Sequence, residues 1–414
     1  MSLVAGWFPV AVAVAAVLAL LALVPWEQRA RWRVLGEAVA VAALLTVLTV
    51  VVLHATGALP WAVPWTFDAW FGAVLLAPVL AVVTWRRVRW RRLLGPVAFV
   101  VCLAAAATVV NQQYGYLPTT RALVDPPADS SSLGSVERER AHHEHLHHGA
   151  VLEVSIPATV SHFAAREAYV WLPPAYLQDP RLSLPVVELL EGSPSDPVDW
   201  ICGGAAAATA DAYARSHAGV APLLVMPDEN GSLTGDTECV DGPAGNAETY
   251  LTVDVPAYLR HTFQAESGPD SLAVAGLSEG ATCSVMLTLR HPGEYRAFGS
   301  YAGLTSPTVG QQVAPAATIR ALFHGSVAQY QAHDPVHLLR HGHDPGTAGW
   351  FEVGSADRPC LRAQTTLVPL ARAAGVTTQA VVVPGGGHDF TLWAQAFAAS
   401  LPFLASHLAT PAAV

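Results

Sequence analysis

The chain has 414 residues, of which 52% are hydrophobic and 13% are charged, and its formal net charge at pH 7 is −10. This length accommodates a membrane module together with one large globular domain. The basic residues are all arginine, and without a basic excess we expect no nucleic-acid partner.

Four apolar runs open the chain and predict four transmembrane helices. The runs are Trp7–Pro25, Ala38–Leu53, Trp70–Trp85 and Leu94–Val110. Each is close to the roughly 20 residues that a helix needs to cross the core of a bilayer. The first run has no basic segment before it and three more runs follow, so we interpret it as part of an anchor and not as a cleaved signal peptide.

The arginines predict how these helices are oriented. The loop after the first run carries Arg29, Arg31 and Arg33, and the loop after the third carries five arginines between 86 and 92, whereas the N-terminus and the loop at 54–68 carry none. By the positive-inside rule both arginine loops are cytoplasmic and the chain after residue 111 lies outside. We therefore expect a multi-pass protein of the plasma membrane.

The expected domains are a transmembrane module (1–110), an extracytoplasmic linker (111–150) and a catalytic domain (151–414). The linker ends in His142–His148, which contains five histidines and one glutamate. Helical spacing would put pairs of these histidines on one face, as a divalent metal requires. The interpretation we favour is a solvated, pH-sensitive helix, and we predict no metal site.

From Val151 onward, short apolar strands alternate with helical segments. The expected strands are 151–156, 167–172, 185–190, 222–226, a run that begins at Leu272, 296–300, 350–354 and 378–383; the expected helices are 204–216, 250–263, 281–290, 362–374 and 390–407. Continuous apolar runs are typical of buried parallel strands. The alternation predicts an α/β fold with a mostly parallel sheet of about eight strands and helices on both faces.

One stretch carries the clearest chemistry. The apolar run from Leu272 leads into Gly276–Gly280, a G-x-S-x-G pattern with Ser278 at its centre, and a helix-compatible segment follows. This order is the context of a nucleophile elbow, which holds the Ser hydroxyl above the edge of the sheet. We predict Ser278 as the nucleophile; the alternative is an incidental Ser in a Gly-rich turn.

A nucleophilic Ser needs a general base and a carboxylate that orients the base, in the chain order Ser, acid, His. His388 follows the last expected strand in a Gly-rich turn, and Asp357 follows the strand before it. We predict His388 as the base and Asp357 as the acid. Asp389 is adjacent to the base in sequence and poorly placed to orient it, while Asp344 and Glu352 remain competitors.

The oxyanion hole is expected to use two backbone N–H groups. One belongs to Glu279, the residue after the nucleophile, and the other to the loop after the third strand. In that loop Gly192 permits a tight backbone, Ser193 offers the N–H, and Pro194 has none. We predict Ser193 and Glu279 as the donors.

Together these motifs resemble the esterase family that contains esterase D and the antigen 85 mycolyltransferases. The residues that carry the resemblance, within about 150–410, are Leu189–Gly192, Met226–Asp228, Gly276–Gly280, His291-Pro292, Gly354 with Asp357, and Gly386–Asp389. The resemblance implies an α/β-hydrolase fold with Ser278, Asp357 and His388 as a triad, and we expect no cofactor. The antigen 85 enzymes have Glu as the acid and lack a four-span anchor. With its anchor, the chain is similar to bacterial hydrolases of aminoacylated phosphatidylglycerol.

Acidic residues dominate the segments after the third and fourth strands of this domain. They are Glu191, Asp196, Asp199, Asp228, Glu229, Asp236, Glu238 and Asp241. An acidic rim would favour a substrate with a cationic amine, whereas a solvated loop or a calcium site are the alternatives. The predicted substrate-binding residues are Glu191, Asp199, Trp200, Asp228, Glu229 and Trp393, where each tryptophan either stacks on a sugar or belongs to the core.

Four cysteines lie in the predicted outer domain. They are Cys202, Cys239, Cys283 and Cys360. Four cysteines permit two disulfides by three connectivities, and a buried free thiol is an equal alternative at Cys283.

The predicted function is a membrane-anchored, outward-facing serine carboxylester hydrolase that acts on lipid esters of the outer leaflet, with aminoacyl-phosphatidylglycerol as the candidate substrate. One alternative is an acyl or mycolyl transferase that uses a sugar such as trehalose. The other is a non-catalytic receptor on a hydrolase scaffold, against which the intact Ser, Asp and His argue.

Overall fold

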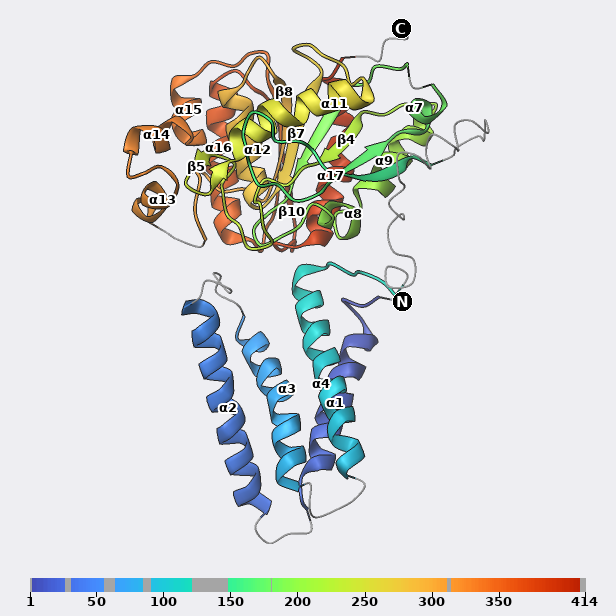
Figure 1. Cartoon of the computed structure of the whole chain (residues 1–414), viewed down its shortest axis with the longest axis vertical. Helices are drawn as coiled ribbons and strands as arrows, with labels where there is room; N and C mark the ends of the chain where they lie inside the picture. Colours follow the sequence, from blue (N-terminus) through green and yellow to red (C-terminus); the bar gives the residue numbers. More distant parts are fainter. Residues whose placement is uncertain are drawn as a thin grey trace. The chain divides into compact units, whose positions relative to one another are not determined.

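The computed structural model describes residues 2–26, 31–55, 64–84, 91–120, 148–179, 181–310 and 314–409. Contacts divide the chain into two compact units, Met1–Val124 and Asp125–Val414 (Figure 1). Most of the predicted histidine cluster, at 142–147, lies outside the described residues. The three predicted domain ranges stay a prediction.

The first unit contains four helices in its described part. They are α1 (Trp7–Leu23), α2 (Arg31–Ala55), α3 (Trp65–Thr84) and α4 (Arg91–Tyr114). By length and composition α2, α3 and α4 could each cross a membrane, whereas α1 is a shorter apolar helix of 17 residues. The structure therefore supports three of the four predicted spans as candidates, and the first stays a prediction.

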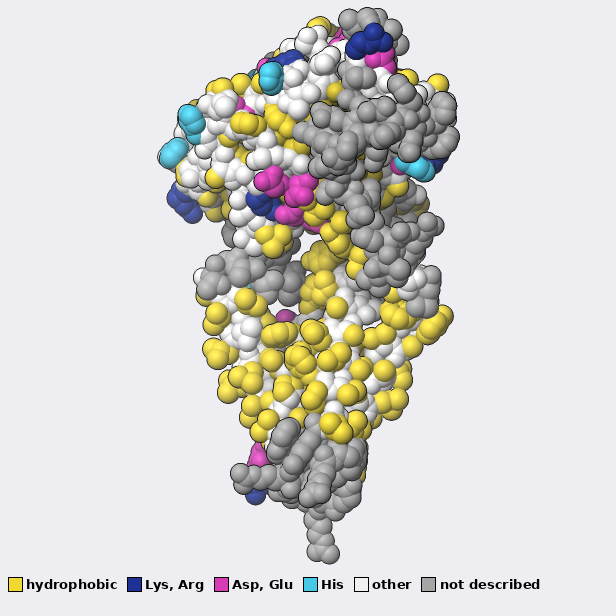
Figure 2. Space-filling model, turned by 45° about the vertical axis from the view of Figure 1, so that its right-hand side comes forward, with side chains coloured by type: hydrophobic (Ala, Val, Ile, Leu, Met, Phe, Trp, Pro, Cys, Tyr) yellow, Lys and Arg dark blue, Asp and Glu magenta, His cyan; other side chains and the backbone are white. Residues whose placement is uncertain are grey.

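Apolar side chains cover the outside of this helical unit. Figure 2 shows its surface largely in yellow, and Val10, Leu44 and Val47 are among its exposed side chains. Small residues such as Ala16 and Ala77 are buried between the helices. Small residues inside and large apolar residues outside are typical of helices that pack in lipid.

An eight-stranded sheet forms the centre of the second unit, in the order β1-β2-β4-β3-β7-β8-β9-β10. The strands are β1 (Ala150–Val154), β2 (Ala168–Leu172), β3 (Val186–Leu190), β4 (Leu223–Met226), β7 (Leu272–Leu277), β8 (Tyr295–Tyr301), β9 (Ala348–Gly354) and β10 (Thr377–Val383). Among the described strands of this sheet, the β1–β2 and β2–β4 pairs are antiparallel and the other pairs are parallel. The predicted mostly parallel α/β sheet of about eight strands is confirmed. A small hairpin, β5 (Asp241–Gly242) and β6 (Gly245–Asn246), lies apart from it.

Two groups of helices pack on this sheet. In the first, α9 (Ala206–Ser216) packs against α17 (Phe390–Ser406), which contacts β8 and β9. In the second, α12 (Glu279–Arg290) covers β7 and β8, while α16 (Arg358–Ala373) covers β9 and β10. Both groups bury apolar side chains, because the inner parallel strands β3, β7 and β9 are buried along their whole length.

Several short helices were not expected from the sequence. They are α7 (Pro174–Gln178), α8 (Asp199–Cys202), α10 (Ala247–Thr249), α13 (Pro315–Leu322), α14 (Val327–Ala332) and α15 (Pro335–His341). The helix expected at 250–263 is present as the π-helical turn η1 (Tyr250–Asp254) followed by α11 (Val255–Phe263). The last three short helices occupy the His-containing insertion before β9. Two of them begin at caps that the sequence contains, since Ser326 accepts a hydrogen bond from Gln329 N–H and Asp334 from Val336 N–H. Helices this short are set by packing more than by periodicity.

Candidate active site

Ser278 lies at the sharp junction of β7 and α12. Its φ of 54° and ψ of −110° are strained for a residue with a side chain. A Cβ at Gly276 would overlap the carbonyl of Gly280, and a Cβ at Gly280 would overlap the carbonyl of Glu191. Both flanking positions must therefore be glycine, as in a nucleophile elbow.

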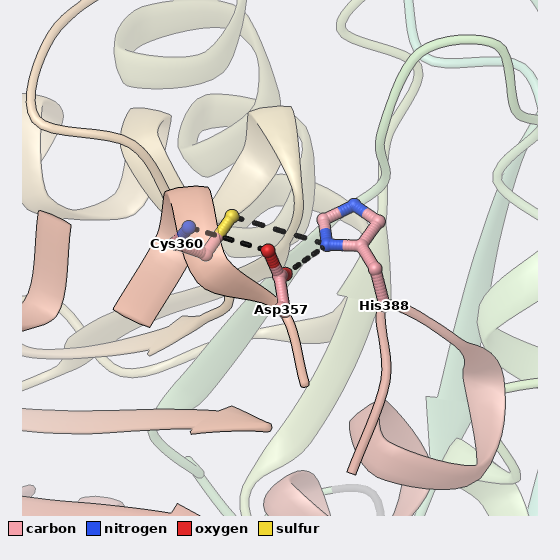
Figure 3. A group of neighbouring side chains, drawn as sticks. All are labelled: Asp357, Cys360 and His388. Atoms are coloured by element: carbon pink, nitrogen blue, oxygen red, sulfur yellow. Dashed lines mark hydrogen bonds and ion pairs between the residues drawn. The ribbon is translucent and has the colours of Figure 1, made fainter. Parts of the chain in front are cut away.

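A hydrogen-bonded chain of three side chains runs from this serine. The Oγ of Ser278 lies 2.9 Å from Nε2 of His388, and Nδ1 of His388 lies 2.6 Å from Oδ2 of Asp357. Figure 3 shows the carboxylate of Asp357 directed at the imidazole. The loops that carry these two residues pass each other closely, because a Cβ at Gly354 would overlap the carbonyl of Gly386. The structure thus brings the three predicted residues together, while their catalytic roles stay a prediction.

The carboxyl group of Asp357 is held in its ionised form. Burial opposes ionisation, but hydrogen bonds from His388 and Cys360 outweigh it and lower the pKa of Asp357 below its ordinary value. One of these bonds is a helix cap: Asp357 Oδ1 accepts from the Cys360 N–H at 3.2 Å, at the start of α16. A carboxylate fixed in this way can orient an imidazole and stabilise its charged form.

The competing acids have other partners. Asp389 caps α17 by accepting from the N–H of Leu392 at 3.0 Å. Glu352 accepts from Nε1 of Trp350 at 2.9 Å within β9. Asp344 lines a shallow pocket of about 470 Å³ beside α15.

The two predicted oxyanion donors lie on segments that meet at the nucleophile. A Cβ at Gly192 would come within 3.1 Å of Cβ of Ser278, so the loop after β3 passes directly beside it. In that loop Ser193 precedes a cis proline, and its Oγ donates to the carbonyl of Gly235 at 2.5 Å. Glu279 opens α12, where the first N–H groups of a helix have no partner within the helix. The role of Ser193 and Glu279 as donors stays a prediction.

Three members of the predicted acidic rim are buried, and their role in substrate binding stays a prediction. Glu191, Asp228 and Glu229 are almost completely buried. Glu191 and Asp228 are paired with Arg166, which lies just before β2 and forms ion pairs with both at 2.6 Å and with Asp196 at 2.8 Å. The sequence pattern did not predict this ion pairing, because Arg166 lies 25 residues before Glu191 in the chain.

Asp199 and Glu229 differ in their hydrogen bonding. Asp199 accepts hydrogen bonds from Oγ of Ser195 at 2.6 Å and from the N–H of Asp196 at 3.0 Å, so it organises the loop after β3. Neither carboxylate oxygen of Glu229 has a hydrogen-bond partner among the described residues. Burial, together with the nearby carboxylates of Glu191 and Glu279, raises its pKa well above the ordinary value.

The two predicted tryptophans have different positions. Trp200 is fully buried, donates from Nε1 to the Leu190 carbonyl at 2.9 Å and packs edge-on against Tyr301. It therefore belongs to the core. Trp393 is nearly buried, and its ring lies edge-on to His388 with 4.9 Å between the ring centroids.

Asn230 is a site residue that sequence reasoning did not single out as part of the nucleophile's surroundings. Its Nδ2 donates to the carbonyl of Gly192 at 3.3 Å and to Oε2 of Glu279 at 3.2 Å. It therefore links the loop after β3 to the start of α12. Its sequence signals were its place in the acidic segment considered as a calcium site and its position four residues after an expected strand end, near the edge where parallel strands present functional residues.

One disulfide attaches a distant segment to the helix that follows the nucleophile. Cys239, in the segment after β4, is bonded to Cys283 in α12. Among the described residues Cys202 and Cys360 take part in no disulfide, so the described part of the second unit contains one of the two disulfides that four cysteines permit. Burial and the neighbouring Asp357 raise the pKa of the Cys360 thiol, which keeps its proton.

Comparison with known proteins assigns the family. The model of the family described as "Putative esterase" matches residues 164–404, so the chain belongs to this esterase family. A protein of Corynebacterium glutamicum described as uncharacterized is 33% identical over 392 residues, which are 92% of this chain and 90% of that protein.

Solved structures agree with the fold. A ferulic acid esterase is 23% identical with a TM-score of 0.54, covering 63% of this chain and 98% of that one. The S-formylglutathione hydrolase from Agrobacterium tumefaciens is 15% identical with a TM-score of 0.54, covering 64% and 98%. At these identities the likeness shows that the second unit has the α/β fold of these hydrolases.

Proposed function

We propose that this protein is a serine carboxylester hydrolase in which Ser278, His388 and Asp357 form the catalytic triad. The observation that carries the proposal is the continuous chain of contacts, 2.9 Å and 2.6 Å long, from a strained elbow serine to a buried carboxylate. Membership of an esterase family supports the same reaction class.

Each residue has one part in the proposed reaction. Oγ of Ser278 attacks the ester carbonyl while Nε2 of His388 takes its proton. Asp357 keeps the other imidazole proton on Nδ1 and stabilises the imidazolium that forms. The N–H groups of Ser193 and Glu279 bind the oxyanion. His388 then protonates the departing alcohol, and water resolves the acyl-serine by the same route.

The proposed place of the reaction is the outer surface of the plasma membrane. The apolar helices α2, α3 and α4 support an anchor, and the distribution of arginines supports an outward catalytic unit. An enzyme fixed to a bilayer meets lipids at high local concentration, so we propose a lipid ester as substrate.

The candidate lipid is an aminoacyl-phosphatidylglycerol. Its support is Glu229, a buried carboxyl group whose oxygens have no partner in the described chain while Arg166 is engaged by its neighbours. An ammonium group that reached Glu229 would remove the repulsion from the surrounding carboxylates. The free amine should then be preferred over an N-acetylated substrate by about 5- to 150-fold in kcat/KM, and Glu229→Gln should abolish the preference. Equal rates on the two substrates would exclude this substrate class.

The test of the esterase proposal is Ser278→Ala in the detergent-solubilised full chain. Hydrolysis of a short-chain aryl ester should fall by about 10³-fold or more, and labelling by a fluorophosphonate should vanish. Ser284→Ala is the matched control, because Ser284 is buried in the same helix and donates to the carbonyl of Gly299. Labelling of Ser278→Ala at the wild-type level would remove Ser278 from the mechanism. Acylated sugar formed on adding trehalose would reassign the reaction to acyl transfer.

A further inference from the structure

Asp357, Cys360 and His388 form a group of three potential metal ligands. Sγ of Cys360 lies 3.9 Å from Nδ1 of His388, and one ligand atom from each residue lies within 4.8 Å of the others (Figure 3). The potential ligand atoms lie on the Nδ1 side of the His388 ring, whereas Nε2 of the same ring faces Ser278. The proposed hydrolysis uses the carboxylate and the imidazole but gives the thiol no part.

We propose that these three residues bind a thiophilic divalent cation, with Zn²⁺ as the best match, and that binding inactivates the triad. Thiolate, imidazole and carboxylate are the usual protein ligands of Zn²⁺. Tetrahedral Zn²⁺, with bonds of about 2.3 Å to sulfur and about 2.0 Å to nitrogen, holds those two atoms about 3.5 Å apart. The 3.9 Å between Cys360 Sγ and His388 Nδ1 is close to that spacing.

The carboxylate must move for the metal to enter. In a tetrahedral site the oxygen and nitrogen ligands are about 3.3 Å apart, whereas Oδ2 of Asp357 lies 2.6 Å from Nδ1 of His388. Binding therefore separates these atoms and breaks their hydrogen bond. Water can complete the coordination, because the His388 side chain is 36% exposed.

Metal binding also places the imidazole proton on the wrong nitrogen. The Cys360 thiol releases its proton to solvent when it becomes a ligand. The metal takes the lone pair of Nδ1 of His388, so the proton formerly on Nδ1 is transferred through solvent to Nε2, and the ring stays neutral with its single N–H on Nε2. An Nε2–H group cannot accept the proton of Ser278. This loss of activity rests on the proposed function, whereas the metal binding itself does not.

The test uses the metal-free, detergent-solubilised full chain without a histidine tag. Titration with Cd²⁺ should produce the ultraviolet charge-transfer band of a cadmium thiolate in the wild type and in Ser278→Ala. Cys360→Ala should lack the band, and Cys202→Ala, which removes the other described cysteine of the second unit that is outside the disulfide, should keep it. Cys360→Ser serves as a second variant of nearly unchanged size, for which the band should also be lost.

Aryl-ester hydrolysis supplies the second readout. Zn²⁺ should inhibit the wild type and Cys202→Ala reversibly, with activity restored by EDTA. In Cys360→Ala the inhibition midpoint, measured relative to the metal-free rate of that same variant, should rise at least about tenfold. Equal inhibition of the wild type and Cys360→Ala would overturn the proposal, as would a missing wild-type cadmium band. A cadmium band in a wild type without esterase activity would instead refute the proposed function and leave the metal site standing.

Discussion

The disulfide between Cys239 and Cys283 should contribute a large share of the stability of the catalytic unit. The bond joins residues separated by 44 positions. For a loop of that length the chain-entropy model gives about 13 cal/mol/K, or about 4 kcal/mol at 25 °C. It ties the segment after β4 to the helix that follows Ser278, so its loss should loosen the nucleophile's surroundings first.

The perturbation is the double substitution of Cys239 and Cys283 by alanine. With an m-value of about 3 kcal/mol/M, a loss of about 4 kcal/mol lowers the urea midpoint by about 1.3 M. Midpoints would be followed by tryptophan fluorescence and by aryl-ester hydrolysis in detergent. The double variant Cys202→Ala/Cys360→Ala is the control, because it removes two thiols without removing a cross-link. A midpoint shift no larger than that of the control would refute the entropic argument.

Three further predictions concern the acid, a buried carboxyl group and the topology. Asp357→Asn should lower kcat by about 10⁴-fold, since an amide does not hold the required tautomer, whereas Asp389→Asn should keep kcat and lose at most about 1 kcal/mol as an altered helix cap; similar kcat values for the two would contradict the triad. Burial, offset only in part by a tyrosine hydrogen bond, raises the pKa of Glu188 from 4.5 to about 8, so between these values the folded state binds more protons and stability falls as pH rises. In Glu188→Gln the stability should therefore fall less steeply between pH 5 and pH 8 than in the wild type. Urea midpoints that change with pH in parallel in the two proteins would disprove this prediction. On a background without free cysteines, a membrane-impermeant thiol reagent should label Ser131→Cys in intact cells and leave Val88→Cys protected; the reverse would place the catalytic unit in the cytoplasm.

Local patterns were sufficient for the fold class and for the triad candidates. Alternating apolar strands and helical segments predicted the sheet, because a parallel strand buried on both faces must be apolar throughout. The elbow was visible because Gly276 and Gly280 are required by a tight turn around Ser278. His388 and Asp357 could be chosen because consecutive parallel strands end at the same edge of a sheet.

The surroundings of the site depended on segments that are distant in sequence. Eight acidic residues in two loops predicted an exposed rim, yet Arg166 enters from before β2 and buries Glu191 and Asp228 in ion pairs. Nothing local in the sequence reports that approach, because ion pairing follows distance in space and not separation along the chain.

Contacts between segments distant in sequence also decided which cysteines pair and where Trp200 lies. Cysteine spacing allowed three pairings, and only the packing of the segment after β4 against α12 brings Cys239 and Cys283 within bonding distance. Trp200 follows the third strand, as a substrate-contacting residue could, but the helix α17 covers it through Phe397. Fold class, elbow and triad candidates were thus determined by short-range sequence rules, whereas burial, charge pairing and the cross-link were decided by tertiary packing, which joins residues that no local pattern connects.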